Sequence, residues 1–488
     1  MRKVFLTTLI VILVTGIVHG GYDVNDVFVK GDSTLMGMKI ESTYFDKGAF
    51  LIETTGARFE YTNGQLKLYQ GLDSKNRRLL STITFDNEPD FVKVESNEDH
   101  ILFWSKDLNI GIYGDSTCII SPKTNQQMNC LGNFKPDYEG RYKGELLLID
   151  DKGGMEIYPQ RYEAGYKIKK IKLGKQNWTA EYELNAGERV MIAAFPGRPF
   201  DWEKSFTSNV AVTGGSYGLG VGNPYGQMAS DWAIKRWATN FHIITVFYNG
   251  FYKLTDINGE QDPAGPYIVA NEPEFRRFLR TAHAAGMKVS VYCSLYSHAR
   301  RNRSNANFYS QISVLKNKFN IDGIYIDGLR FDNGSSKHDD KIGNWEMVRR
   351  FRQLFGSDGV IVYHGTSLGG PIATVPNIDT YCDATLNGES VAFQSANDSY
   401  IQYQVRKYGI SNTVALWKPG PHPDSITHKD ITEALIRMNG RKRWHLSAAR
   451  PKPPQGRYIW SVRLGTEYRY YLDLLEHNKR VYLNKSNR

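Results

Sequence analysis

The sequence predicts a multidomain chain with an all-β sandwich, then an α/β domain of the (β/α)8 barrel class, then a short basic segment. Three observations support this fold class. Residues 21–195 contain short strand-like runs separated by turn signals, without a helical pattern. Residues 196–445 alternate strand-like and helical runs in units of about 30–40 residues. The 488 residues provide enough chain for several domains of roughly 100–200 residues each.

The first 20 residues predict a secretory signal peptide. Arg2 and Lys3 precede an apolar stretch from Val4 to Val18, and Val18-His19-Gly20 offers a cleavage site. The alternative is an uncleaved N-terminal anchor. The stretch is short for a bilayer span, and no second run of about 20 apolar residues follows. We therefore expect a secreted or periplasmic protein without a membrane span.

The sandwich is expected because apolar and polar residues alternate in short runs. Asn63-Gly64 is a typical hairpin turn between two of these runs. Cys118 and Cys130 lie in one turn-rich stretch, where they could form a disulfide, and Cys293 and Cys382 lie in strand-like runs typical of buried thiols. The strand-like runs of this domain include residues 49–53, 57–61, 65–69 and 100–104.

The barrel is expected because repeated strand–helix units favour a parallel sheet, and about 250 residues suit a barrel. A glycine-rich stretch at 214–222 lacks the glycine spacing of nucleotide-binding loops, which disfavours a doubly wound dinucleotide fold. Residues 446–488 would form the basic segment, with the last barrel strand as an alternative. The predicted strands are 242–248, 288–292, 323–327, 359–363, 381–385 and 414–417, and the predicted helices are 272–285, 305–319 and 345–355.

Asp327 is the first candidate catalytic residue. In the run from Ile321 to Asp327, period-two alternation places Ile324 and Ile326 on one face and Tyr325 with Asp327 on the other. A carboxylate at the inner face is costly unless it is partnered or used. Because the chemistry of barrels lies where strands end, this position favours function.

A second carboxylate is expected near the predicted strand at 381–385. Glu389 follows the strand in a turn led by Asn387-Gly388 and is the first choice for a general acid/base. Asp383 is the second choice. In the alternative interpretation, Asp383 bonds a backbone turn and Glu389 is a solvated loop residue.

The segment from Asp322 to Asp327 resembles the strand-four nucleophile motif of the retaining α-galactosidase and α-glucosidase superfamilies, which carry a β-sandwich before a (β/α)8 barrel. The resemblance implies a divergent glycoside hydrolase that cleaves an oligo- or polysaccharide with retention, through a covalent glycosyl-enzyme. It implies that Asp327 is the nucleophile and that a carboxylate near strand six is the acid/base. The chain departs from the pattern at Phe247-Tyr-Asn-Gly, where an aspartate-rich sugar clamp is expected, and at Asn387-Gly-Glu389, where a plain aspartate is expected.

Further residues at strand ends suit a carbohydrate substrate. Aromatic rings there can stack on sugar faces, a histidine can bond hydroxyls, and an arginine-rich loop suits an anionic sugar, although each residue could equally be core or solvated loop. We expect no cofactor and no metal. The candidate substrate-binding residues are Tyr248, Tyr292, Tyr325, Arg300, His364 and Trp417.

The net charge of +10 does not by itself indicate a nucleic-acid partner. Residues 441–488 hold 12 Lys and Arg against 3 Asp and Glu, and residues 1–20 hold two further bases without an acid, so the two domains are near neutral. We therefore expect a carbohydrate partner and no nucleic acid. Two alternatives remain open: a non-catalytic carbohydrate-binding protein on a barrel scaffold, and a metal-dependent barrel hydrolase.

Overall fold

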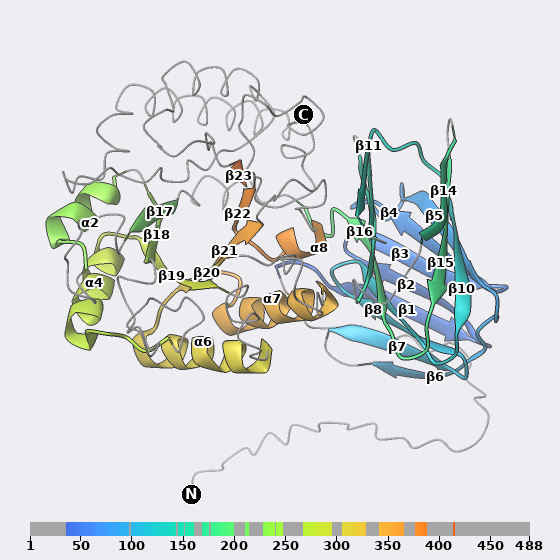
Figure 1. The fold of residues 1–488 in the computed structure, drawn as a ribbon, viewed down its shortest axis with the longest axis horizontal. Coiled ribbons are helices and arrows are strands. Elements are labelled where there is room, and N and C mark those ends of the chain that lie inside the picture. The colour runs from blue at the N-terminus through green and yellow to red at the C-terminus, as the bar shows by residue number, and fades with distance from the viewer. Residues whose placement is uncertain are drawn as a thin grey trace, which may run out of the picture.

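The protein has an antiparallel β lobe beside a lobe with one parallel sheet and several helices (Figure 1). The computed structural model describes residues 36–96, 99–142, 145–150, 152–160, 168–174, 177–199, 210–213, 228–239, 241–246, 267–294, 305–327, 341–365, 376–387 and 413–414. The proposed signal segment, the glycine-rich stretch and the basic segment lie outside these residues. The domain boundaries predicted above therefore stay predictions.

The N-terminal lobe is a sandwich of two eight-stranded sheets, which confirms the predicted all-β architecture. All pairs within each sheet are antiparallel. The first sheet has the order β1 (Ile40–Asp46), β2 (Ala49–Thr54), β3 (Ala57–Thr62), β4 (Gln65–Gln70), β5 (Arg78–Phe85), β10 (Gln126–Gly132), β15 (Trp178–Leu184), β14 (Ile168–Leu173). The second has the order β11 (Tyr138–Tyr142), β12 (Glu145–Asp150), β13 (Gly153–Pro159), β16 (Val190–Phe195), β9 (Thr117–Pro122), β8 (Leu108–Tyr113), β7 (His100–Ser105), β6 (Phe91–Ser96).

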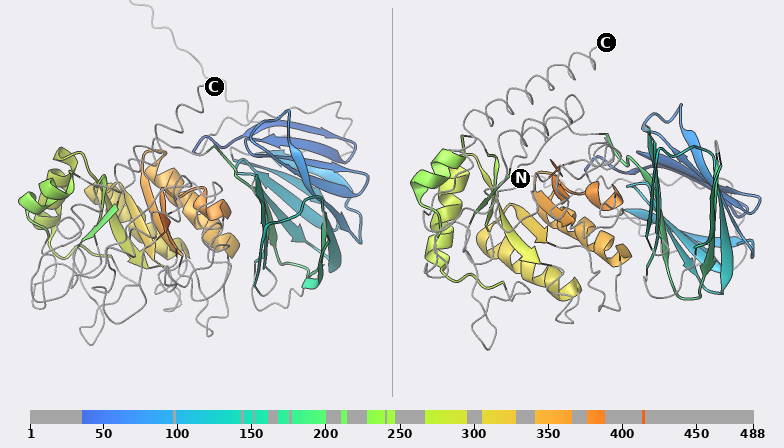
Figure 2. Two further views of the ribbon diagram at one scale, coloured as in Figure 1. Left: turned by 90° about the horizontal axis from the view of Figure 1, so that it is seen from above. Right: turned by 45° about the horizontal axis from the view of Figure 1, so that its top comes forward.

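Alternation along the strands produces the core between these two sheets (Figure 2). In β3, for example, Ala57, Phe59 and Tyr61 are buried, while the residues between them are partly exposed. Aromatic rings meet across the sandwich, since Phe50 of the first sheet stacks on Phe103 of the second at 4.0 Å between ring centroids. The predicted hairpin turn is also confirmed: Asn63 and Gly64 both have positive φ, as a two-residue type I′ turn requires.

The predicted disulfide is wrong. Cys118 lies in β9 of one sheet and Cys130 in β10 of the other, and both are free, buried thiols. Proximity in sequence does not bring two Cβ atoms to bonding geometry when the intervening chain crosses between sheets. Burial raises the pKa of Cys130 to about 12. Cys293 and Cys382 are buried thiols as predicted.

Within the described residues, the second lobe contains seven parallel strands in sequential order. This is the strand order of a βα barrel, because a doubly wound sheet reverses direction at its switch point. The described strands include neither an eighth strand nor a pair between the first and the last, so closure into a barrel stays a prediction. The strands are β17 (Val210–Thr213), β18 (Ile243–Val246), β19 (Lys288–Ser294), β20 (Gly323–Asp327), β21 (Val360–Gly365), β22 (Ala384–Asn387) and β23 (Thr413–Val414).

The described helices of this lobe cover one side of the parallel sheet. Helix α6 has the predicted bounds, α4 ends one residue early, and α7 begins four residues before its predicted start. Two helices and strand β17 were not predicted, and the predicted strand at 381–385 begins only at Ala384. The helices are α2 (Asp231–Trp237), α4 (Glu272–Ala284), α6 (Asn305–Phe319), α7 (Lys341–Phe355) and α8 (Pro376–Asp379).

Helix α4 shows how local sequence sets an element. The side chain of Asn271 caps the helix by accepting a hydrogen bond from the backbone N–H of Glu274 at 3.2 Å. Pro273 occupies the first turn, where its missing N–H costs nothing. Gly286, with φ of +75°, ends the helix in the left-handed region. The buried face carries Phe275, Phe278, Leu279 and Ala282 at helical spacing.

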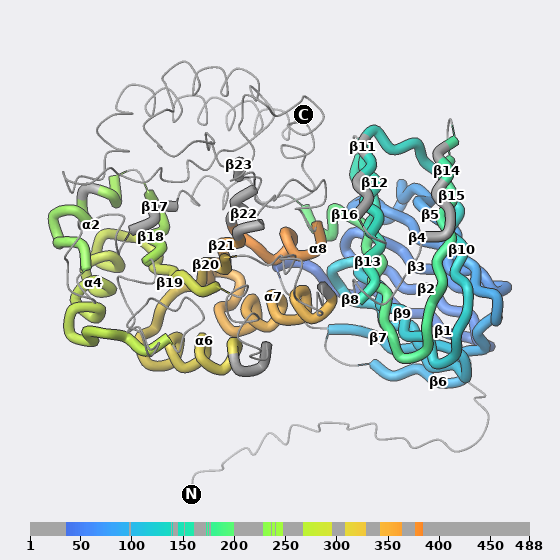
Figure 3. Tube along the Cα trace, in the orientation of Figure 1, coloured from blue at the N-terminus to red at the C-terminus, as the bar shows by residue number. Residues whose placement is uncertain are grey.

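The two lobes share a buried polar interface, with α7 and α8 on the side of the parallel sheet that faces the sandwich (Figure 3). Asp115 of the sandwich accepts hydrogen bonds from Trp345 Nε1 at 2.8 Å and from the hydroxyl of Tyr381 at 2.6 Å. Arg349 of α7 donates to Asp99 at 2.6 Å. Because Asp115 and Trp345 are both buried, the sandwich is part of the structure that supports the parallel sheet.

Candidate active site

Asp327 is the last residue of β20, as the sequence predicts, and β20 is the fourth strand of the parallel sheet. Ile324 and Ile326 lie in the core that the sheet shares with the helices, whereas Tyr325 lies outside that core. Asp327 is half-buried. Its backbone pairs with Ser294 of β19 and His364 of β21, both near the C-terminal ends of their strands. The carboxylate therefore belongs to the edge at which parallel α/β folds place their chemistry.

The side chain of Asp327 is held by a phenol from the neighbouring strand. The hydroxyl of Tyr292 donates a hydrogen bond to Asp327 Oδ2. The ring of Tyr292 stacks on that of Tyr325, with centroids 5.5 Å apart and planes inclined by 21°. A hydrogen bond to an ionised acceptor is among the stronger kinds, so this contact orients the carboxylate.

Both tyrosines are buried, at 4% and 5% exposure, so their rings pack inside the protein beside Asp327. The structure places Tyr292 in contact with Asp327 and Tyr325 against the ring of Tyr292, and the substrate-binding roles of the two tyrosines stay predictions. The ring of Tyr292 was expected to stack on a sugar, and its contact with Asp327 was not predicted from the sequence. Its hydroxyl instead contacts the candidate nucleophile directly.

The same face of β18 and β19 is polar. The hydroxyls of Thr245 and Ser290 are 2.8 Å apart, and both residues are fully buried. The hydroxyl of Tyr267 accepts a hydrogen bond from the backbone N–H of Ser294 at 3.1 Å. Sequence reasoning missed Thr245, Ser290 and Tyr267, although Ser290 shares a period-two face with Tyr292 and could have been found from it.

Asp383 does not lie near Asp327. It precedes β22, and its Oδ2 accepts from the backbone N–H of Ile361, near the start of β21, at 2.7 Å. The same oxygen accepts from Arg352 Nη2 at 2.6 Å, and the two side chains are 0% and 1% exposed. Asp383 therefore lies at the N-terminal edge of the sheet, opposite to Asp327, in a buried ion pair that substrate cannot reach. This geometry assigns it a structural role.

The guanidinium of Arg352 connects several elements at that edge. It donates to the carbonyl of Tyr381 from Nε at 2.9 Å and from Nη2 at 2.6 Å. Its Nη1 donates to the carbonyls of Gly356 at 3.1 Å and Gly359 at 2.9 Å. The side chain of Arg352 thus provides hydrogen bonds to backbone carbonyls after the end of α7, before the start of β21 and before β22.

Asp379 is a second buried carboxyl at this edge, and it has no such partner. It is 0% exposed, and neither carboxyl oxygen has a hydrogen-bond partner within the described part of the chain. Burial raises the pKa of Asp379 well above its ordinary value. Asp379 is consequently protonated in the folded protein under conditions in which an exposed aspartate is ionised.

Replacing Asp379 by asparagine should therefore make stability less dependent on pH. In the native protein the folded state holds this proton and the unfolded state releases it above about pH 3.9, so the free energy of unfolding falls as pH rises, until the raised pKa is reached. Asparagine carries no titrating proton. The difference in unfolding free energy between variant and wild type should increase by up to about 1.4 kcal/mol per pH unit in this window. Denaturant unfolding at several pH values measures it, and a difference that is constant with pH would contradict the assignment.

Several predicted site residues lie outside the described residues: Tyr248, Arg300, Glu389 and Trp417. For His364 the structure describes the backbone, which pairs with Asp327. Glu389 follows Asn387, the last residue of β22, whose backbone pairs with Gly365 at the C-terminal end of β21. Strand β22 therefore ends at the same edge as β20, and the roles of these four residues stay predictions.

Replacing Tyr292 by phenylalanine removes the hydroxyl that orients Asp327 and keeps the ring. If the protein hydrolyses glycosides, we expect kcat to fall about 10- to 100-fold, the value of a hydrogen bond to a charged group, with KM little changed. Tyr309→Phe, which removes a hydroxyl from α6 and keeps a ring that contacts Phe351 of α7, is the matched control. Steady-state kinetics on an aryl glycoside separates the two variants. Equal kcat values for both would exclude a positioning role for Tyr292.

No described helix is long and apolar enough to cross a membrane.

No protein-family model matches the chain, and no curated protein matches it. Among solved structures, the chain is similar to an uncharacterized protein of Listeria monocytogenes EGD-e, with TM-score 0.39, 10% identity and coverage of 89% of this chain and 54% of that one. It is similar to the cycloalternan-forming enzyme of Listeria monocytogenes, with TM-score 0.38, 10% identity and coverage of 90% and 54%. It is also similar to a GH36 alpha-galactosidase of Geobacillus stearothermophilus, with TM-score 0.41, 10% identity and coverage of 94% and 73%.

The chain spans about half the length of the first two of these structures, since it covers 54% of each. Glycoside hydrolases are thus among the solved structures that the chain is similar to.

Proposed function

We propose that the protein is a glycoside hydrolase that cleaves a glycosidic bond in an oligo- or polysaccharide, with Asp327 as its nucleophile. The observation that carries this proposal is a half-buried carboxylate at the C-terminal end of the fourth parallel strand, oriented by the hydroxyl of Tyr292. Asp383 and Asp379, two further carboxyls close to the parallel sheet, are buried. Asp327 alone of these three lies at the edge where substrate can approach.

The proposed reaction proceeds with retention. Asp327 attacks the anomeric carbon and forms a glycosyl ester, while the bond to the leaving oxygen breaks and that oxygen takes a proton from Glu389. A water molecule then gives its proton to Glu389 and attacks the anomeric carbon, which releases Asp327 and the sugar. Retaining enzymes place the two carboxyl groups about 5–5.5 Å apart, which is the separation we propose for Asp327 and Glu389.

A screen of aryl glycosides tests the proposal. The panel should contain α- and β-linked substrates with neutral and with acidic sugars, because the arginine-rich sequence at 300–303 leaves the charge of the sugar open. The Asp327→Ala variant is the blank for each substrate. NMR of the first-formed anomer distinguishes retention from inversion. Release of the aryl group at the rate of the blank throughout the panel would contradict the proposal.

Replacing Glu389 by glutamine should separate the acid step from the nucleophilic step. We expect kcat/KM on a substrate with a poor leaving group to fall about 100- to 10,000-fold, the usual contribution of general acid catalysis. A dinitrophenyl glycoside, whose leaving group needs no proton, should still form the glycosyl-enzyme rapidly. Glu95→Gln changes an exposed glutamate of β6 and is the control. Equal losses on both substrates would argue against Glu389 as the acid.

A further inference from the structure

The sandwich carries an open pocket on the outer face of its first sheet. Its volume is about 650 Å³, within the roughly 300–1,000 Å³ typical of small-molecule sites. The pocket lies on strands β1 to β4 and under the loop that follows β4, and Asp327 belongs to the other lobe. The residues that matter for the argument are Ser42, Glu53, Arg58, Tyr69, Lys75 and Arg77.

The floor of the pocket is one row of side chains across four strands. Ser42 pairs with Glu53, Glu53 with Arg58, and Arg58 with Tyr69 in the register of neighbouring strands. Directly paired residues point to the same face of a sheet, so these four side chains lie side by side. All four are partly exposed, while the residues that alternate with them, such as Ile52 and Phe59, are buried in the core.

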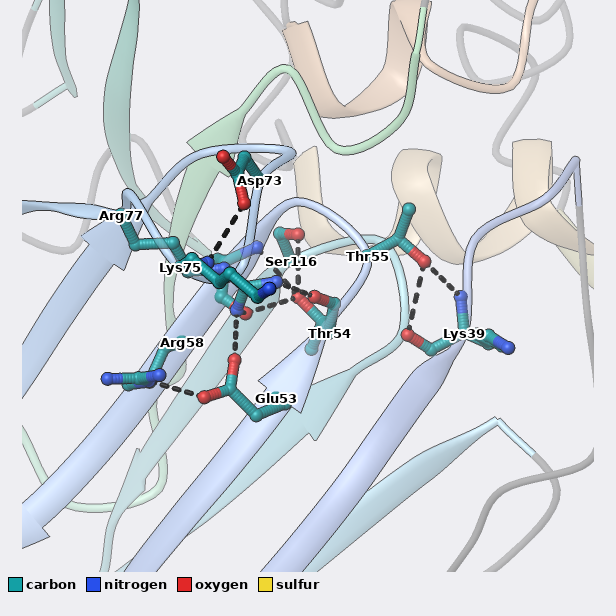
Figure 4. Close-up of polar contacts among 10 residues, drawn as sticks. Lys39, Glu53, Thr54, Thr55, Arg58, Asp73, Lys75, Arg77 and Ser116 are labelled. Carbon is teal, nitrogen blue, oxygen red and sulfur yellow. Dashed lines mark hydrogen bonds and ion pairs between the residues drawn. The ribbon is translucent and has the colours of Figure 1, made fainter.

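The pocket is preformed, because the loop above it is tied to the strands. The guanidinium of Arg77 is 1% exposed and bonds Glu53 and the carbonyls of Thr54 and Ala57, so that Arg58 and Arg77 lie on two sides of Glu53 (Figure 4). Asp73 braces the loop by accepting from the backbone N–H of Lys75 at 3.0 Å. A ligand would meet an ordered site and would not need to order it first.

The chemistry of the pocket suits hydroxyl groups. Guanidinium and ammonium groups donate, the carboxylate of Glu53 accepts, and Ser42 does both. A sugar hydroxyl likewise donates and accepts. The ring of Tyr69, with the guanidinium of Arg58 at 5.8 Å from its centroid, adds an apolar surface. Because Glu53 is bonded by two guanidiniums, it is unsuited to acid or nucleophile work.

We propose that this pocket binds a sugar unit of a carbohydrate chain and is a second, non-catalytic binding site. The choice of ligand class rests on the proposed function, whereas the site itself rests on the sandwich. Such a site would hold a polysaccharide on the protein and would raise its local concentration for the reaction at Asp327.

Binding to the full-length Asp327→Asn variant, which removes turnover, tests the proposal. The probes are maltohexaose, cellohexaose, mannohexaose and hexagalacturonate, titrated by calorimetry. We expect at least one probe to bind and Arg58→Ala or Tyr69→Ala to weaken that binding by about tenfold or more. Lys67→Ala, on the same outer face in the neighbouring row, is the matched control and should leave binding unchanged. A preference for hexagalacturonate over the neutral probes would identify the ligand as acidic.

Two results would overturn the proposal: none of the four probes binds, or binding is the same in Arg58→Ala, Tyr69→Ala and Lys67→Ala. A separate experiment tests the proposed hydrolase function: turnover of short aryl glycosides is measured with the Arg58→Ala variant, in which Asp327 is intact. Pocket-dependent binding without turnover of any glycoside would support the pocket and contradict the hydrolase. Turnover without pocket-dependent binding would support the hydrolase function and contradict the sugar-binding pocket.

Discussion

Replacing Asp327 by asparagine is expected to lower kcat on any glycoside that the protein hydrolyses by roughly four orders of magnitude, as loss of a nucleophile does in other covalent mechanisms. The amide cannot form the glycosyl ester, so the first chemical step is lost. The fold should be unaffected. Asp327 is half-buried at the end of β20, and an asparagine oxygen can still accept the hydrogen bond from Tyr292.

Azide distinguishes a lost nucleophile from a damaged site. In Asp327→Gly, azide can enter the space left by the carboxylate and attack the anomeric carbon of an activated aryl glycoside. The expected product is a glycosyl azide of inverted configuration, with partial recovery of aryl release. Thermal unfolding of each variant should match that of the wild type. A kcat for Asp327→Asn within about tenfold of the wild-type value would reject the nucleophile assignment.

Replacing Asp383 by asparagine is expected to lower the free energy of unfolding by about 3–5 kcal/mol. The variant would leave the guanidinium of Arg352, whose side chain is 0% exposed, without its only carboxylate among the described residues. A buried charge without a partner is costly because water no longer solvates it. The midpoint of thermal or denaturant unfolding measures the effect.

Two comparisons make this prediction specific. Glu95→Gln breaks an exposed pair with Lys93 and should change stability by less than about 1 kcal/mol, since solvent screens such pairs. Replacing Asp383 and Arg352 together by leucine and methionine should cost less than the sum of the single changes, because no charge is left unpaired. An Asp383→Asn protein with wild-type stability and no turnover would instead restore Asp383 as the acid/base.

Periodicity in the sequence was a good guide wherever an element depends on its own residues. The α6 helix carries the buried residues Phe308, Ile312, Leu315 and Phe319 at helical spacing, and β20 is a short apolar run that ends at Asp327, so both were predicted with their observed bounds. The short helix α8 and strand β17 were missed, because four residues carry too little periodic signal to be recognised. The start of β22 was wrong for a related reason: Tyr381 and Cys382 are apolar and buried but belong to the turn after α8.

The sequence alone was enough to predict the all-β lobe, six of the seven described parallel strands in their order along the chain, and the position of Asp327 at the end of its strand. These follow from local alternation and from the spacing of strand and helix patterns, which neighbouring residues encode. Only the tertiary structure decided which carboxyls are partnered. Asp327 and Asp383 both adjoin a parallel strand, yet one meets the phenol of Tyr292 and the other the guanidinium of Arg352. A strand pattern does not show from which edge of the sheet a residue projects, or which distant side chain is buried beside it, because those partners come from other strands and helices.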